Sequence, residues 1–154
     1  MELILWRHAE AEDTYPDMSR ALSGKGQQQA KKMGAWLRQH LPANTRILVS
    51  PAKRTQQTAE AIGLPFTTVE ALAPGASAQQ ILDAAQWATA NDTALIIGHQ
   101  PTLGIAAALA MTHKPHYWCI KKPVCGGSPA AYAGMKSRPY CVLLFRRISY
   151  SRTE

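Results

Sequence analysis

Three short apolar segments, each followed at once by polar residues, constrain the fold of this chain more than any other feature. The segments cover residues 3–6, 47–49 and 95–97. An apolar run of this length that leads into a helical pattern is typical of a buried strand in a parallel sheet. The carboxyl ends of parallel strands meet along one edge of the sheet, where helix N-termini also point and where open α/β folds bind ligands. We therefore expect the polar residues after the three segments to lie close together.

The residues that follow the segments suit an anionic ligand. Arg7 and His8 follow the first segment directly, Arg54 comes shortly after the second, and His99 follows the third. Imidazole is one of the side chains that form covalent intermediates, and the arginine guanidinium presents a planar fork of donors that matches phosphate or carboxylate oxygens. These four residues are our candidate catalytic and anion-binding residues.

Taken one at a time, the same residues also have structural interpretations. The Arg-His pair could be a strand end that becomes polar as it reaches solvent. Arg54 could form a surface ion pair with Glu60 or Glu2, and His99 could cap the helix that follows it. The agreement of four matching positions, rather than any one of them, favours a shared site.

Helical patterns alternate with the strands. We predict helices that begin near Ser23 and reach about Gln39, that follow Ser50-Pro51, that begin after Ser77, and that open at Pro101. Serine is a preferred N-cap, and proline suits a first helical turn. Predicted strands cover residues 2–7, 45–50, 66–69, 93–98 and 140–147, and Trp36 and Trp87 are expected in the core or against helices. This order predicts an α/β fold, a three-layer αβα sandwich with a mostly parallel central sheet.

The ordered set of segments resembles the histidine phosphatase superfamily, and within it the small phosphohistidine phosphatases of the SixA type. The Arg-His-Gly signature of the superfamily reads Arg-His-Ala at residues 7–9, and further matching segments lie at residues 20–26, 49–60 and 97–101. The match runs from the first residue to about residue 122. It implies a phosphoglycerate mutase-like fold and a single histidine phosphatase domain over residues 1–154, with a divergent part at 123–154.

The resemblance also implies roles for individual residues. His8 is similar to the nucleophile that becomes phosphorylated, and His99 to the second histidine of the pocket. Arg7 and Arg54 correspond to the arginines that grip the phosphoryl oxygens, and Arg20 to a further phosphate-contacting arginine of the small members. The expected activity is metal-independent hydrolysis of phosphohistidine on a protein through a covalent phosphohistidine intermediate, with no cofactor.

The chain differs from larger members of the superfamily at the residue that donates a proton to the leaving group. Those members have a glutamate soon after the third strand, whereas Glu70 lies before the corresponding loop here and the loop contains no carboxylate. We expect the donor to be missing, as in phosphohistidine phosphatases, whose imidazole leaving group can take a proton from solvent. Glu70 and Glu12 remain the alternatives for a hidden acid.

Other function classes stay open beside this one. They are a small-molecule phosphomonoesterase of the same superfamily and a non-catalytic phosphoprotein-binding module. The net charge of +7 keeps a nucleic-acid-binding protein in view, but the basic residues are scattered and no nucleic-acid motif is present, so we expect no nucleic-acid partner. The expected partner is a phosphorylated protein, such as a histidine-containing phosphotransfer domain, or a small phosphorylated molecule.

Cysteine usage and hydropathy bear on the compartment and on metal binding. The three cysteines show no spacing typical of a disulfide framework. The first residues do not resemble a signal peptide, and no apolar run reaches transmembrane length. We therefore predict a cytoplasmic protein without a membrane partner. Two groups of residues offer possible ligands. The acids at residues 10–13 follow one another in a loop, where such residues are usually solvated, and the histidines and cysteines at 113–125 lack a paired second half with firm spacing. We therefore predict no metal.

The last part of the chain follows a different pattern. Up to residue 122 the sequence tracks the subgroup, which continues with glycine and a Val-Trp-Trp strand, whereas this chain continues Pro-Val-Cys-Gly-Gly. Codons for Val-Cys-Gly-Gly can be written so that another reading frame spells Val-Trp-Trp. This suggests the hypothesis that residues 123–154 are frame-shifted, through a mutation or a sequencing error.

Overall fold

Over residues 1–118 and 142–146, the central sheet has five strands, of which four are parallel. The structure is a computed structural model that describes residues 1–118 and 142–146. The strands are β1 (Glu2–Arg7), β2 (Arg46–Val49), β3 (Thr67–Thr68), β4 (Thr93–Gly98) and β5 (Val142–Arg146). Their order is β3-β2-β4-β1-β5, and β5 alone runs antiparallel, against β1. The predicted strand positions are confirmed to within two residues at each end.

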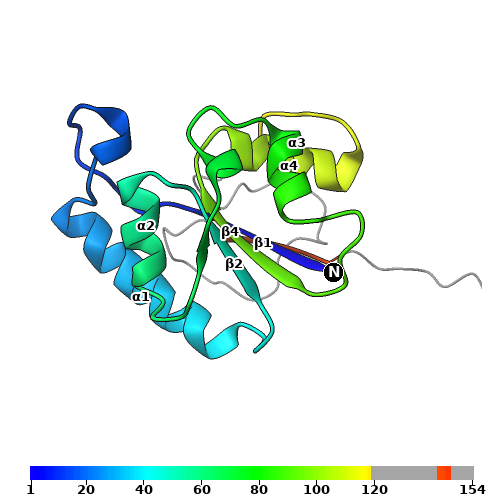
Figure 1. The fold of residues 1–154 in the computed structure, drawn as a ribbon, viewed down its shortest axis with the longest axis horizontal. Helices are drawn as coiled ribbons and strands as arrows, with labels where there is room; N and C mark the ends of the chain where they lie inside the picture. Colours follow the sequence, from blue (N-terminus) through cyan, green and yellow to red (C-terminus); the bar gives the residue numbers. More distant parts are fainter. Residues whose placement is uncertain (119–141, 147–154) are drawn as a thin grey trace, which may run out of the picture.

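In the part of the chain that the structure describes, two pairs of helices cover the two faces of this sheet. The helices are α1 (Gly24–His40), α2 (Lys53–Glu60), α3 (Ala78–Ala84) and α4 (Thr102–Thr112). Figure 1 shows α1 and α2 on one side of the sheet and α3 and α4 on the other. The predicted α/β sandwich of three layers is therefore confirmed.

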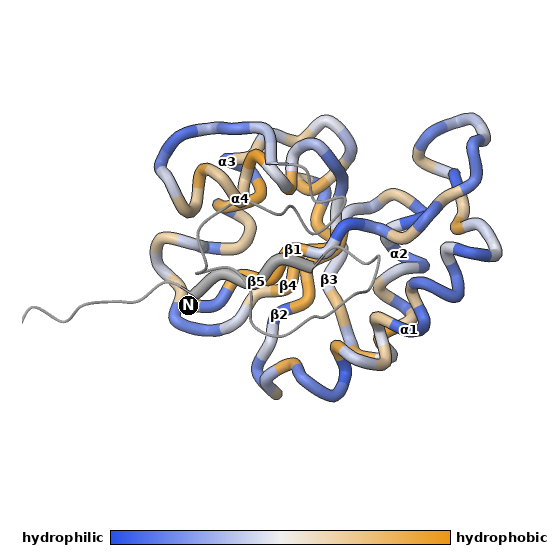
Figure 2. The backbone as a smooth tube through the Cα atoms, turned by 180° about the vertical axis from the view of Figure 1, so that it is seen from behind, coloured by the Kyte–Doolittle hydropathy of each residue, from blue (hydrophilic) through white to orange (hydrophobic). Residues whose placement is uncertain are grey.

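The side-chain alternation of the strands explains why both faces are covered. Leu3 and Leu5 of β1 pack in the core cluster beneath α3 and α4, whereas Ile4 and Trp6 pack in the cluster beneath α1 and α2. All six residues of β4 are buried, which is typical of a central parallel strand. Figure 2 shows the hydrophobic residues concentrated in the central strands and the hydrophilic ones in the outer loops.

Serine caps fix the starts of two helices where the sequence predicted them. The Ser23 hydroxyl accepts a hydrogen bond from the Gly26 N–H at 3.0 Å. Ser77 and Gln80 form a capping box at the start of α3. Each such cap satisfies a backbone N–H that has no partner within the helix, which contributes about 1 kcal/mol.

The start of α2 differs from the prediction, because Pro51 lies outside the helix. The helix begins at Lys53 with Ala52 as its N-cap. The chain between β2 and α2 is held as a turn by the Ser50 carbonyl, which accepts hydrogen bonds from the side chains of Thr55 at 2.9 Å and Gln56 at 2.6 Å. This turn delays the helix by two residues.

Two short 3-10 helices and one tryptophan were not predicted correctly. The 3-10 helices are η1 (Asp17–Ser19) and η2 (Glu70–Leu72). Trp36 is 38% exposed and stacks on His40 of its own helix with ring centroids 4.2 Å apart, so the core, one of the two positions predicted for it, is wrong. Trp87 packs against the core cluster as predicted.

The C-terminal part is described only in β5. The three cysteines at 119, 125 and 141 and most of the segment 123–154 lie outside the described residues, so the frame-shift hypothesis stays a prediction. Within the described ranges, no helix is long and apolar enough to cross a membrane.

Candidate active site

The carboxyl ends of the three central strands place the candidate residues at one edge of the sheet. Arg7, the last residue of β1, is in register with Gly98, the last residue of β4. Val49, the last residue of β2, is in register with Ile97 of the same strand. The residues that follow β1, β2 and β4 therefore leave the sheet side by side, as the apolar segments predicted.

His8 is held by the backbone on one side of its ring. The backbone N–H of His8 donates to the Gly98 carbonyl at 3.1 Å. The ring Nδ1 lies 2.7 Å from the carbonyl oxygen of Ala9. A carbonyl oxygen only accepts, so Nδ1 carries the proton and Nε2 keeps its lone pair. The Ala9 N–H in turn donates to the Thr58 hydroxyl at 3.1 Å, which ties this turn to α2.

His99 is buried beside His8, with ring centroids 5.3 Å apart. Its Nδ1 accepts from Arg54 Nη2 at 3.3 Å, because a guanidinium can only donate. The proton therefore lies on Nε2, which donates to the Ser50 hydroxyl at 2.7 Å. The interpretation of His99 as a simple helix cap is wrong, since its ring joins β4 to the turn after β2 and to α2.

Both histidines are neutral at physiological pH. Burial, followed in importance by the positive charge of Arg54, lowers the pKa of His99 from 6.5 to about 3. Burial also lowers the pKa of His8 from 6.5 to about 4, against the opposing hydrogen bond to Ala9 and with the help of Arg54, Arg7 and Arg20. A neutral imidazole with a free nitrogen lone pair is the nucleophilic form of histidine.

These pKa values predict that the protein loses stability in mild acid. Between pH 6.5 and about 4 the unfolded chain protonates both histidines and the folded chain does not. The free energy of unfolding therefore falls as the pH falls through this window, on the order of 1–2 kcal/mol per histidine between pH 7 and pH 5. Urea unfolding at the two pH values measures the loss, and His99→Gln should reduce it. Equal stability of the wild type at pH 7 and pH 5 would contradict the assignment.

Arg54 lies in the first turn of α2 and is buried, with 5% of its side chain exposed. Its Nη1 donates to the Asp17 carbonyl at 2.6 Å and its Nη2 to the Asp17 carboxylate at 3.0 Å. The alternative of a surface ion pair with Glu60 or Glu2 is therefore wrong. The Arg54 Nε is a buried nitrogen without a hydrogen-bond partner.

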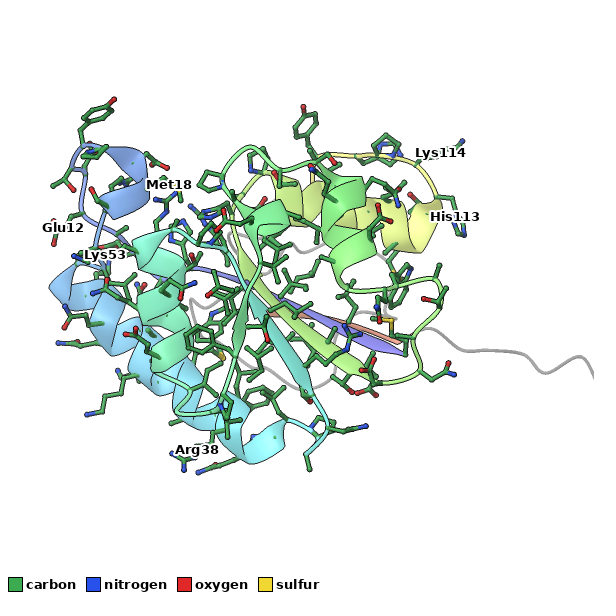
Figure 3. All side chains as sticks on the ribbon, viewed as in Figure 1. Glu12, Met18, Arg38, Lys53, His113 and Lys114 are labelled. Carbon is green, nitrogen blue, oxygen red and sulfur yellow. The ribbon has the colours of Figure 1, made fainter. Side chains whose placement is uncertain are left out.

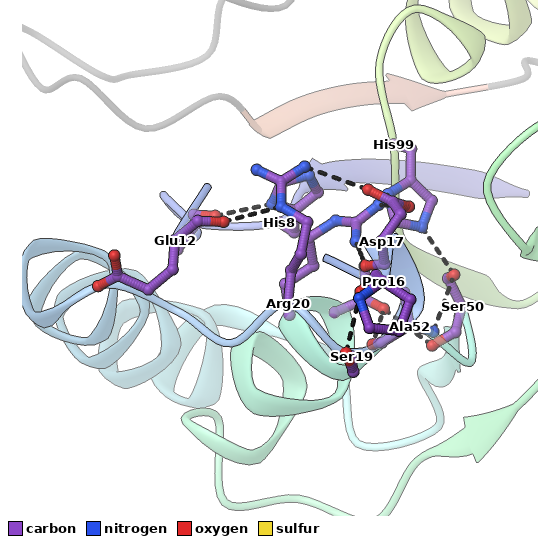
Figure 4. A network of polar contacts seen from close by, with 12 residues as sticks. His8, Glu12, Pro16, Asp17, Ser19, Arg20, Ser50, Ala52 and His99 are labelled. Atoms are coloured by element: carbon purple, nitrogen blue, oxygen red, sulfur yellow. Dashed lines mark hydrogen bonds and ion pairs between the residues drawn. The ribbon is translucent and has the colours of Figure 1, made fainter. Parts of the chain in front are cut away.

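Arg20 approaches the same carboxylate from the loop after β1. Its Nη1 lies 3.1 Å from Asp17 Oδ1, and its Nε donates to the Glu12 carbonyl at 2.7 Å. Figure 4 shows Arg20, His8, Asp17 and His99 gathered in this network. Arg7 lies half-buried at the end of β1 and lowers the pKa of His8 and of His99 by its charge. The structure thus brings all five candidate residues to one place.

Sequence reasoning missed the contribution of Asp17. The only signal for it is its position three residues before Arg20, which is a common spacing in loops and helices alike. Ser50 and Thr58 lie in a segment that the sequence had singled out, but their contacts with His99 and Ala9 could not be read from spacing. All three bond to groups distant in the sequence.

Among the described residues, neither alternative proton donor contributes its side chain to the hydrogen bonds of this network. Glu12 is exposed, and Figure 4 shows its side chain directed away from His8 and His99. Glu70 is exposed in η2. Over residues 1–118 and 142–146, no three His, Cys, Asp or Glu side chains gather in a way that could hold a metal ion.

Comparison with known proteins supplies the relationship. Residues 3–73 match the sequence model of the histidine phosphatase superfamily, branch 1. An uncharacterized protein of Picosynechococcus is 35% identical over 133 residues, which cover 79% of this chain and 81% of the relative. The phosphohistidine phosphatase SixA of Escherichia coli is 27% identical over 131 residues, 82% of this chain and 76% of that protein. An uncharacterized Mycobacterium tuberculosis protein is 35% identical, and the match spans 66% of each protein.

Solved structures agree with the sequence relatives. A protein from Nakamurella multipartitia, described as a candidate SixA phosphohistidine phosphatase, shares 36% identity with a TM-score of 0.60 over 67% of this chain and 61% of that chain. The protein histidine phosphatase SixA in complex with tungstate shares 28% identity with a TM-score of 0.58 over 70% of this chain and 75% of that chain. This chain belongs to the histidine phosphatase superfamily.

Proposed function

We propose that this protein is a phosphatase that hydrolyses phosphohistidine on a protein substrate, with His8 as the nucleophile. The observation that carries the proposal is the His8 imidazole, neutral and with its Nε2 lone pair free, beside the buried His99 and the Arg54 guanidinium. The relationship to SixA phosphohistidine phosphatases supports the substrate class, and the tungstate bound to one of them is an oxyanion of phosphate-like shape.

The first chemical step transfers the phosphoryl group to the protein. His8 Nε2 attacks phosphorus in line, so that an N–P bond forms as the N–P bond to the substrate imidazole breaks. The leaving imidazole takes a proton from water. Charge spreads over the three equatorial oxygens of the phosphoryl group, and Arg7, Arg20 and Arg54 are the cations that stabilise it. The Arg54 Nε, buried and without a protein partner, is a donor suited to one of these oxygens.

The second step regenerates the free protein. Water attacks the phosphorus of phosphorylated His8, a P–O bond forms, and the N–P bond breaks to release inorganic phosphate. The imidazole of His8 returns to its neutral form, because the hydrogen bond from Nδ1 to the Ala9 carbonyl holds the same proton throughout. The pKa of His99 is lowered to about 3, so His99 stays neutral near pH 7 and does not exchange a proton in this step. Its role is the hydrogen bond that it accepts from Arg54.

The carboxylates of the described residues favour an imidazole leaving group over an alkoxide. Glu12 points away from the site and Glu70 is exposed. Asp17 is close, but its hydrogen bond with Arg54 lowers the pKa of its carboxyl group, so that it carries no proton to donate near neutral pH. An alkoxide needs a proton as it leaves, whereas an imidazole is far more easily protonated from solvent.

We therefore expect a strong preference for phosphohistidine. With a phosphorylated histidine-containing transfer protein, kcat/KM should exceed that with a phosphoserine peptide or a sugar phosphate by about 100-fold or more, which is the usual contribution of a general acid. Release of inorganic phosphate measures all three substrates, and His8→Ala provides the blank. Equal or faster cleavage of the alkyl phosphates would show a small-molecule phosphomonoesterase instead.

A further inference from the structure

Among the described residues, Asp17 is the one that accepts side-chain hydrogen bonds from both Arg54 and Arg20. Its Oδ2 lies 3.0 Å from Arg54 Nη2, and its Oδ1 lies 3.1 Å from Arg20 Nη1. Its carbonyl oxygen accepts a third hydrogen bond, from Arg54 Nη1 at 2.6 Å. Asp17 begins the short helix η1, and Figure 4 shows it between Arg20 and His99.

The hydrogen bonds of Arg54 distinguish the two edges of its guanidinium group. Nη1 and Nη2 both donate to Asp17, so Asp17 covers the outer end of the group. The other edge consists of Nε and the second hydrogen of Nη2, and this hydrogen points to His99 Nδ1. The Nε on this edge is buried and has no partner. On the edge that faces the histidines, Nε is therefore the donor left for an oxyanion, and Asp17 does not cover it.

The charge of Asp17 also acts on the pair of arginines. Two guanidinium groups that share one small site repel each other, and Arg54 is almost completely shielded from water whereas Arg20 is 26% exposed. A carboxylate between them offsets this repulsion with two charge-assisted hydrogen bonds. Without the carboxylate, Arg20 keeps only its side-chain hydrogen bond to the Glu12 carbonyl, and Arg54 loses one of the contacts that fix its plane while the Asp17 carbonyl and His99 remain.

We propose that Asp17 is a positioning residue. It holds Nη1 and Nη2 of Arg54 and Nη1 of Arg20, so that the Nε of Arg54 faces the phosphoryl group. The proposal rests on the proposed function. It differs from a role as a plug, in which Asp17 would compete with phosphate for the arginines, because Asp17 and the oxyanion use different edges of Arg54.

The kinetic test replaces Asp17 and compares the change with a matched control. Asp17→Ala should lower kcat for a phosphorylated histidine-containing protein by about 10- to 100-fold, because a misplaced donor loses much of its transition-state stabilisation. Asp17→Asn keeps one acceptor oxygen and should recover part of the loss. Asp13→Ala removes an exposed carboxylate from the same loop and should leave kcat unchanged. Unchanged or faster turnover in Asp17→Ala would overturn the proposal, and faster turnover would indicate a plug.

A spectroscopic measurement tests positioning without relying on activity. The Nε–H of Arg54, assigned by its loss in Arg54→Lys, should give a resolved ¹H–¹⁵N signal that shifts when inorganic phosphate is added to the wild type. In Asp17→Ala this signal should broaden or disappear, while Asp13→Ala keeps it. An unchanged Arg54 signal in Asp17→Ala would overturn the proposal. If neither the wild type nor Asp13→Ala hydrolyses any phosphorylated substrate, the proposed function has failed, and the signal alone decides the role of Asp17.

Discussion

His8→Ala is expected to abolish hydrolysis of a phosphorylated histidine substrate, with a fall in kcat of about 10⁴-fold or more, as for other nucleophile replacements. No other described residue places an unprotonated ring nitrogen in the same position, because both nitrogens of His99 are engaged, one by Ser50 and the other by Arg54. Initial rates of phosphate release, measured with substrate in excess, give the effect.

The control for this replacement is a histidine outside the site. His40 is exposed near the end of α1, and His40→Ala should keep wild-type turnover. His8→Ala should still bind inorganic phosphate, since the arginines remain. Turnover within tenfold of the wild type in His8→Ala would contradict the assignment of the nucleophile. If the wild type binds the phosphorylated protein without turnover, and His8→Ala binds it equally well, the chain is a binding module.

Arg54 should give the second largest effect. Arg54→Lys is expected to lower kcat/KM by about 10²- to 10³-fold, the range found when one preorganised donor to a developing charge is removed. Lysine keeps the positive charge but cannot contact Asp17, His99 and a phosphoryl oxygen from one rigid plane. A steady-state assay of the variant with the phosphorylated protein measures this loss.

Arg38→Lys provides the matched control for Arg54→Lys. Arg38 is an exposed arginine of α1, and Figure 3 shows it at the bottom of the view, away from Met18 of η1. This control should leave kcat/KM unchanged. If Arg54→Lys also retained wild-type kcat/KM, positive charge alone would suffice at this position, and a planar guanidinium would not be required.

The sequence predicts the sheet and the helices because local signals define them. The strands are apolar runs that end in polar residues, and the serines at the starts of α1 and α3 mark helix N-termini through hydrogen bonds within three residues. Pro51 was misread because its preference for a first helical turn is weaker than the contacts of the Ser50 carbonyl, which hold the chain as a turn. Trp36 was misread because large aromatic residues are usually buried.

Part of the candidate site could be predicted from the same pattern. Parallel strands bring their carboxyl ends together, so the positions of His8 and His99 follow from topology alone. The link between Asp17 and Arg54 could not be predicted, because it joins residues 37 positions apart through a loop without periodicity. The sequence also does not show which ring nitrogen of His8 and His99 carries the proton. In His8 this depends on the carbonyl of Ala9, and in His99 on the guanidinium of Arg54.

The central claim is that the Nε2 of His8 receives a phosphoryl group. The most direct test mixes the wild-type protein with a phosphorylated histidine-containing protein, stops the reaction within milliseconds under alkaline conditions that preserve phosphohistidine, and analyses the peptides by mass spectrometry. We predict one added phosphoryl group on the peptide that contains His8, linked at Nε2, and none on the same peptide of His8→Ala. Phosphate release through a burst of turnover with no phosphorylated His8 peptide, or phosphorylation of His99 instead, would contradict the account.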